Sequence, residues 1–174
     1  MFDLRSMNRL QALSSREKLL IAFVLIAILS RLIPHLPNFT AVTATALFAG
    51  RHFKNKTLAF AVPFAVMILS DVILGFYTIS WFVYASFAAV VFLGQWSQKM
   101  NVLTVLSSSL AFFIISNFGV WLLGYPLTVE GFIACYTAAI PFFRNALLGD
   151  FFYAAVLFYS FKWVERRYLL GVQS

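Results

Sequence analysis

The sequence predicts an all-α membrane protein with six transmembrane helices, and three observations lead to this fold class. Hydrophobic residues make up 62% of the 174 residues and charged residues only 11%, whereas soluble domains are far less apolar. The mean hydropathy is +0.88. Six apolar runs alternate with polar connections, and basic residues gather in every second connection. This composition excludes a soluble globular domain, a disordered tail and a secreted disulfide scaffold.

The first two predicted spans differ in length and composition. Residues 19–33 form an apolar run that ends before a proline and contains one charge, Arg31. Residues 41–50 are rich in small side chains, and Asn38 or Thr40 is the expected N-cap of this second helix. The second helix covers only about 15 Å, so it must be buried in protein or lie in a thinned bilayer.

The remaining four spans are predicted at residues 57–76, 81–96, 102–123 and 142–164. Pro126 and Pro141 interrupt the stretch between the fifth and sixth spans. Because proline breaks helices, this stretch is expected to be an outer loop with one short helix at residues 129–139. The expected divisions are an N-terminal segment, a transmembrane domain and a C-terminal tail, at residues 1–18, 19–164 and 165–174.

The distribution of positive charge gives the expected orientation. Eleven of the thirteen Lys and Arg residues fall at the two termini and in the connections after the second and fourth spans. The other connections contain no Lys or Arg outside the helices. Because cytoplasmic loops are enriched in Lys and Arg, both termini are expected in the cytoplasm, and the number of spans is expected to be even.

Polar side chains inside the predicted spans concentrate near the outer boundary. Arg31, Asp71, Asn117 and Asp150 all lie within roughly 5–12 Å of the outer end of their spans. Further polar and aromatic candidates lie just above them: Asn38, Trp81, Trp121, Tyr136, Arg144 and Asn145. Such a one-sided cluster predicts an outward-facing pocket for a small polar molecule, since a channel or proton relay would place polar groups across the full thickness.

These candidates would act in different ways on a ligand. The charged ones would supply charge complementarity, the asparagines would orient the ligand by hydrogen bonds, and the aromatic rings would cover flat surface. Plainer interpretations stay open. Arg31 can pair with a membrane-embedded aspartate solely to let helices pack, and Asn117 can cross-link two helices. Trp81 and Trp121 lie where an interfacial aromatic belt is expected, and Arg144 can anchor that interface.

The sequence lacks the usual catalytic motifs. It contains no His-Glu-x-x-His helix, no Walker lysine and no Gly-x-Ser-x-Gly elbow. Asp71 and Asp150 lack the flanking residues of intramembrane aspartyl proteases, so we expect no enzyme, no cofactor and no resident metal. The single cysteine, Cys135, is either a small buried apolar residue or an axial thiolate for the cobalt of a bound corrinoid.

A resemblance to known proteins extends over about residues 19–164. The segments that carry it are Pro37-Asn38-Phe39-Thr40, Ala46-Leu47-Phe48-Ala49-Gly50, Leu69-Ser70-Asp71 with Gly75-Phe76, Asn117-Phe118-Gly119-Val120-Trp121, Gly124-Tyr125-Pro126, Cys135-Tyr136, and Ala139-Ile140-Pro141-Phe142-Phe143-Arg144-Asn145 with Gly149-Asp150. The chain resembles an uncharacterised family of small six-helix bacterial membrane proteins. That family is similar to the substrate-binding S components of energy-coupling-factor (ECF) vitamin transporters.

The resemblance implies a multi-pass uptake protein of the bacterial cytoplasmic (inner) membrane. It implies a vitamin or similar micronutrient held near the outer face, and release inward by toppling of the whole protein. The implied partners are an ECF coupling subunit and two ATPases, with no nucleic acid. S components that dock on a shared module typically carry Ala-x-x-x-Ala on helix one, whereas this chain has Ala22 and Ala27.

This departure argues against docking on a shared module. Solitary S-component relatives, including cobalamin carriers, work without one, so a corrinoid is one candidate ligand. The alternative function is a structural or assembly subunit of the cell envelope that transports nothing.

Overall fold

In the computed structural model, the described residues are 13–32, 37–97 and 99–170. They form six α-helices and no strand: α2 (Ser15–Leu29), α3 (Val42–His52), α4 (Lys56–Leu74), α5 (Ser80–Trp96), α6 (Val102–Gly124) and α7 (Val129–Val164). Two short segments continue α2 and α7, the 3₁₀-helix η1 (Ser30–Leu32) and the π-helix η2 (Glu165–Leu170). The first five predicted spans coincide with α2 to α6 to within a few residues, and the sixth span lies within the longer helix α7. The ends of the chain, at 1–12 and 171–174, lie outside the described residues.

Side chains at the helix starts explain four of the N-termini. Ser14 forms a capping box with Glu17 at the start of α2. Asn55, Asn101 and Thr128 accept hydrogen bonds from backbone N–H groups at the starts of α4, α6 and α7. The expected cap of α3 by Asn38 or Thr40 is wrong, because Ala41 occupies the N-cap without a side-chain bond.

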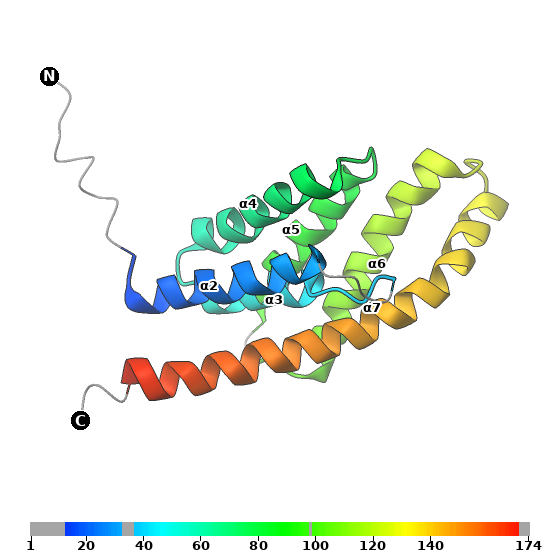
Figure 1. The fold of residues 1–174 in the computed structure, drawn as a ribbon. Coiled ribbons are helices and arrows are strands. Elements are labelled where there is room, and N and C mark those ends of the chain that lie inside the picture. The colour runs from blue at the N-terminus through cyan, green and yellow to red at the C-terminus, as the bar shows by residue number, and fades with distance from the viewer. Residues whose placement is uncertain (1–12, 33–36, 98, 171–174) are drawn as a thin grey trace, which may run out of the picture.

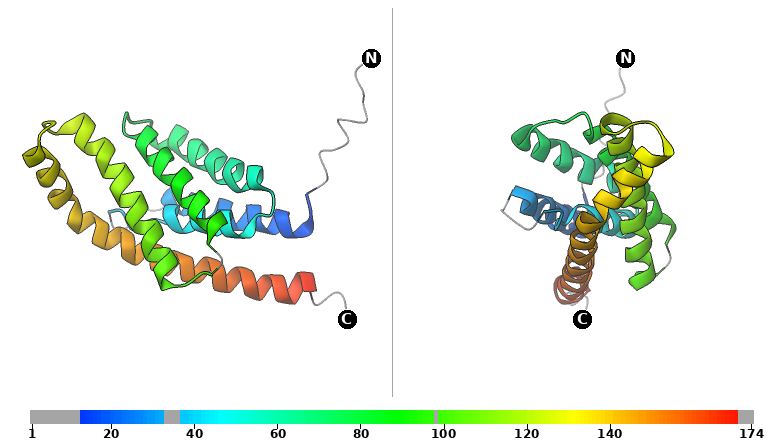
Figure 2. Two further views of the ribbon diagram at one scale, coloured as in Figure 1. Left: turned by 180° about the vertical axis from the view of Figure 1, so that it is seen from behind. Right: turned by 90° about the vertical axis from the view of Figure 1, so that its right-hand side faces the viewer.

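The largest difference from expectation concerns α7. The predicted short outer helix and the sixth span form one continuous helix of 36 residues, with Pro141 in its interior. Figures 1 and 2 show that this helix curves along the length of the molecule. Proline removes one helical hydrogen bond and clashes with the preceding turn, so it bends a helix that packing on both sides holds together.

The short helix α3 lies at the centre of the molecule. All residues from Val42 to Gly50 are buried, and α3 contacts each of the other five α-helices. A Cβ atom on Gly94 of α5 would lie 2.6 Å from the carbonyl oxygen of Leu47, so the two backbones approach closely. Of the two alternatives for this short helix, burial in protein and a thinned bilayer, the structure shows burial in protein.

Among the residues that the structure describes, three helical segments are long and apolar enough to cross a membrane: α4, α6 and Val129–Arg167. The apolar helix α5 is shorter, at 17 residues. The start of α2 and the end of α7 lie on the same side of the molecule, and the turn between α6 and α7 lies at the opposite extremity (Figures 1 and 2).

Candidate functional site

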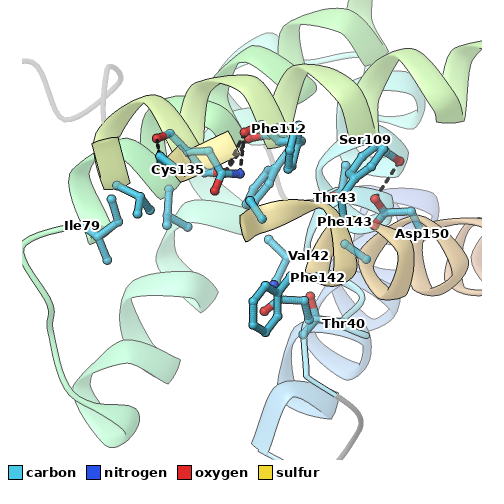
Figure 3. Close-up of a pocket in the computed structure, with 18 of the residues that line it drawn as sticks. Thr40, Val42, Thr43, Ile79, Ser109, Phe112, Cys135, Phe142, Phe143 and Asp150 are labelled. Atoms are coloured by element: carbon cyan, nitrogen blue, oxygen red, sulfur yellow. Dashed lines mark hydrogen bonds between the residues drawn. The ribbon is translucent and has the colours of Figure 1, made fainter. Parts of the chain in front are cut away.

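A cavity of about 550 Å³ lies where the start of α3 meets four other helices and the loop that precedes it. The lining residues come from the loop before α3, the starts of α3 and α5, the interior of α4, the middle and C-terminal half of α6 and the middle of α7. They are Asn38, Thr40, Val42, Thr43, Met67, Ile79, Val83, Ser109, Phe112, Phe113, Ser116, Asn117, Val120, Tyr125, Cys135, Ala138, Ala139, Phe142, Phe143, Ala146 and Asp150. Figure 3 shows that rings and hydroxyl groups lie around the same space. We call it the Asp150 cavity.

Among the described residues that line the cavity, Asp150 alone is of the Asp, Glu, Lys, Arg or His type, and it is 3% exposed. The Ser109 hydroxyl donates to its Oδ2 at 2.7 Å (Figure 3). The Thr43 side chain and the Ala44 backbone lie beside the same carboxyl group. Side chains from three helices therefore meet at this carboxyl, which α7 carries toward the start of α3.

The loop before α3 is held against α7 beside Asp150. The Asn145 Nδ2 atom donates to the carbonyl of Pro37 at 3.2 Å. A Cβ atom on Gly149 would lie 3.2 Å from the Phe39 Cα atom. The loop backbone therefore packs closely against α7 at this glycine. Asn38 adopts a positive φ of 62° and lines the cavity. Asn145 thus positions the loop, and Asn38 belongs to the cavity wall.

The hairpin of α6 and α7 closes another side of the cavity. The Asn117 Nδ2 atom donates to the Phe113 carbonyl at 2.8 Å within α6, and Asn117 lines the cavity. Cys135 is 2% exposed, and its thiol donates to the Asn117 carbonyl at 3.7 Å. The Tyr136 hydroxyl donates to the Ile114 carbonyl at 2.7 Å. These contacts tie the hairpin together.

Four other sequence candidates lie away from the cavity lining or outside what is described. Asp71 is 6% exposed and accepts a 2.6 Å hydrogen bond from the Tyr84 hydroxyl, so it links α4 to α5. Trp81 is 76% exposed, and Arg144 is also exposed. The Arg31 backbone lies in η1, but its side chain is outside what the structure describes.

Trp121 belongs to the turn after α6. Its Nε1 atom donates to the Pro126 carbonyl at 3.0 Å, and its ring meets Phe132 edge-on at 5.3 Å. It does not line the Asp150 cavity. Of the ten candidates from the sequence, the structure brings Asn38, Asn117 and Asp150 together in one cavity wall.

Several cavity residues were missed by the sequence interpretation. Thr43, Ser109 and Ser116 supply hydroxyl groups, and Phe112 and Phe113 supply ring surface. The run of three serines at 107–109 in an apolar helix was an available signal, because hydroxyl side chains in spanning helices often meet another polar group. The candidates were restricted to the outer ends of the spans, and Ser109 lies deeper.

The lining of the Asp150 cavity combines hydrogen-bonding side chains with apolar and aromatic surface. Its walls are mostly apolar and aromatic with a few convergent polar atoms, as in many small-molecule sites. Within residues 13–32, 37–97 and 99–170, no group of three or more His, Cys, Asp or Glu side chains could hold a metal ion. The arrangement can hold a small solute that presents a hydrogen-bond donor to Asp150.

The comparisons with known proteins identify a family without assigning an activity. The chain belongs to the family of unknown function DUF6580, whose model matches residues 11–172. Neither the curated proteins nor the solved structures contain a match to it. The function must therefore be argued from the site itself.

Proposed function

We propose that this protein is a membrane uptake protein that binds a small vitamin-like solute in the Asp150 cavity, in the manner of ECF S components. One observation carries the proposal: a cavity of about 550 Å³ reaches a buried carboxyl group at the centre of an apolar helical protein. Polar groups inside such proteins are costly and usually functional. The volume lies within the range of about 300–1,000 Å³ that small-molecule sites occupy.

The lining indicates the chemical class of the solute. A buried carboxylate is costly unless a positive charge or hydrogen-bond donors compensate it. No Lys, Arg or His lines the cavity among the residues described, so compensation comes from hydroxyl and amide groups of the protein and from the ligand. We infer a solute with a protonated or donor nitrogen for Asp150 and a flat body for Phe112 and Phe113.

This proposal does not extend to a corrinoid bound through Cys135. The thiol is 2% exposed and is engaged with the Asn117 carbonyl, so it ties α7 to α6. A small solute that leaves this contact intact agrees better with the cavity.

The membrane setting belongs to the same proposal. We place the protein in the bacterial inner membrane with six spans and both termini in the cytoplasm, which the distribution of basic residues supports. The cavity then lies nearer the outer face. A coupling subunit and ATPases are the partners that an S-component mode implies. The two alanines of α2 offer them little surface, because Ala27 is buried and Ala22 is partly buried.

The test compares two buried aspartates. Protein purified in mild detergent is examined by native mass spectrometry, with denaturing identification of any co-purified small molecule and a thermal-shift panel of vitamins. Asp150→Asn should lower ligand affinity at least tenfold, because it removes the negative charge that faces the cavity. Asp71→Asn is the matched control, and it should keep ligand affinity within about twofold.

Two results would contradict the proposal. One is a stable, empty wild-type protein without a thermal shift for any vitamin, which would favour the envelope-subunit alternative. The other is equal loss of ligand in both aspartate variants at unchanged folding, which would show that the cavity is not the binding site.

A further inference from the structure

A second cavity, of about 720 Å³, lies at the other ends of the same helices. It is lined by the start of α2, the end of α3, the start of α6 and the last turns of α7. Figure 1 shows the start of α2 and the end of α7 on the same side of the molecule. We call it the basic cavity. Nothing in the proposed function uses it.

The lining of the basic cavity carries an excess of positive charge. Arg16, Arg51 and Lys162 contribute three cations and Glu165 one carboxylate, which leaves a formal charge of +2. Burial among aromatic rings lowers the pKa of His52 to about 4, so this side chain is neutral at pH 7. The charge of the cavity therefore comes from arginine and lysine alone.

One of these cations is fixed in place by the fold. The Arg16 Nε atom donates to the Glu165 carboxylate at 2.5 Å, and its guanidinium also donates to the His52 carbonyl at 2.7 Å. The same guanidinium lies 5.6 Å from the centre of the Phe161 ring. Arg16 thus joins α2, α3 and α7. Arg51 and Lys162 are exposed residues of the same lining.

Apart from His52, Asn101 and Tyr159, the rest of the lining is apolar, and it continues onto exposed apolar surface. Ala155 and Phe158 of α7 line the cavity beside Val102 of α6, which is exposed. A soluble phosphate compound would leave this apolar wall in contact with water. A ligand with both an anionic group and a hydrocarbon chain matches both parts of the cavity.

We propose that the basic cavity binds an anionic phospholipid, with its phosphate at Arg51 and Lys162 and an acyl chain along Ala155 and Phe158. Basic pockets between helices on the cytoplasmic side are the sites where such headgroups bind. The inference is independent of the solute bound in the Asp150 cavity.

The experiment uses the full chain in a neutral detergent. Native mass spectrometry measures retention of phosphatidylglycerol and of phosphatidylcholine with the same acyl chains, and inorganic phosphate is added as a competitor. Phosphatidylglycerol should bind at least tenfold more tightly than phosphatidylcholine, and millimolar phosphate should not displace it. Equal binding of the two lipids would overturn the proposal. Displacement by phosphate alone would indicate a site for a soluble anion instead.

Paired variants separate the cavity from general surface charge. The double variant Arg51→Gln/Lys162→Gln should lose at least tenfold in phosphatidylglycerol affinity. Lys54→Gln/Lys56→Gln removes the same charge from exposed positions outside the cavity lining and should change it less than twofold. Equal losses in both would overturn the proposal.

A further variant keeps the test decisive if the charge variants do not fold. Ala155→Leu leaves every charge in place and fills the apolar wall, so it should also weaken lipid retention at least fivefold. Unchanged retention would overturn the placement of the acyl chain.

Discussion

Three helices, α3, α6 and α7, line both cavities, yet the two cavities have opposite charge. The Asp150 cavity contains one carboxyl group and no described cation, whereas the basic cavity contains three cations and one carboxylate. Asp150 and Phe151 are adjacent in α7 and line different cavities. The same three helices can therefore line cavities of opposite charge. We base the ligand class proposed for each cavity on the charged residues that line it and on how deeply they are buried.

The largest expected effect comes from a position that both cavities depend on. Gly94→Val places a side chain against the Leu47 carbonyl of α3, whose backbone cannot yield without moving the central helix. Such overpacking should lower the free energy of unfolding by roughly 3 kcal/mol and abolish binding at both cavities. Size-exclusion profiles and melting temperatures in detergent measure the loss of stability, and native mass spectrometry measures the loss of binding.

The matched control for this substitution is Ala85→Val, at an exposed position of the same helix. It should leave the melting temperature within about 2 °C of wild type. A Gly94→Val protein that kept one ligand and lost the other would break the comparison, because it would show that the cavities do not share α3 as a common support.

A smaller and more selective effect is expected from two identical substitutions on α7. Ala146→Leu fills space in the Asp150 cavity, and Ala155→Leu fills space in the basic cavity. Each should weaken its own ligand about five- to tenfold and the other ligand less than twofold, as native mass spectrometry measures. If either variant weakened both ligands equally, the cavities would not be independent sites.

The smallest effect is a dependence of stability on pH at the basic end. His52 lies after the predicted second span, and burial, opposed in part by a backbone hydrogen bond with Phe48, lowers its pKa from 6.5 to about 4. Unfolding lets it take up a proton below pH 6.5, so the folded state loses stability as pH falls from 6.5 toward 4. The slope is at most about 1.4 kcal/mol per pH unit.

His52→Phe removes this titration and keeps an aromatic ring beside Phe48 and Phe158. The drop in melting temperature between pH 7 and pH 5 should be several degrees smaller in the variant than in wild type. Between pH 8 and pH 7 the two proteins should behave alike. An identical drop at pH 5 would show that His52 does not account for the acid sensitivity.

The sequence predicts the helices better than it predicts the site, and particular residues show why. Apolar runs locate the helices because a helix needs apolar side chains whether lipid or protein surrounds it. Pro141 led to the prediction of two helices where the structure has one. The effect of a proline is read from the neighbouring sequence, whereas the contacts that keep α7 continuous come from other segments. The short length of α3 left burial in protein and a thinned bilayer as alternatives, and its small residues suit the close packing that the structure shows.

Depth along a helix did not distinguish the two buried aspartates. Asp71 and Asp150 both lie in the outer parts of their predicted spans, and each accepts a bond from a hydroxyl group. The helical rotation that turns one toward Tyr84 and the other toward a cavity depends on how the helices pack. Thr43 and Ser109 were missed for the same reason. The sequence does not show which group on another helix a hydroxyl side chain will contact.

The continuous helix α7 contributes a wall to each of the two cavities. A helix of 36 residues is about 54 Å long, and its middle forms one cavity wall while its last turns form the other. Because one continuous helix joins the two walls, its length sets the distance between the two cavities.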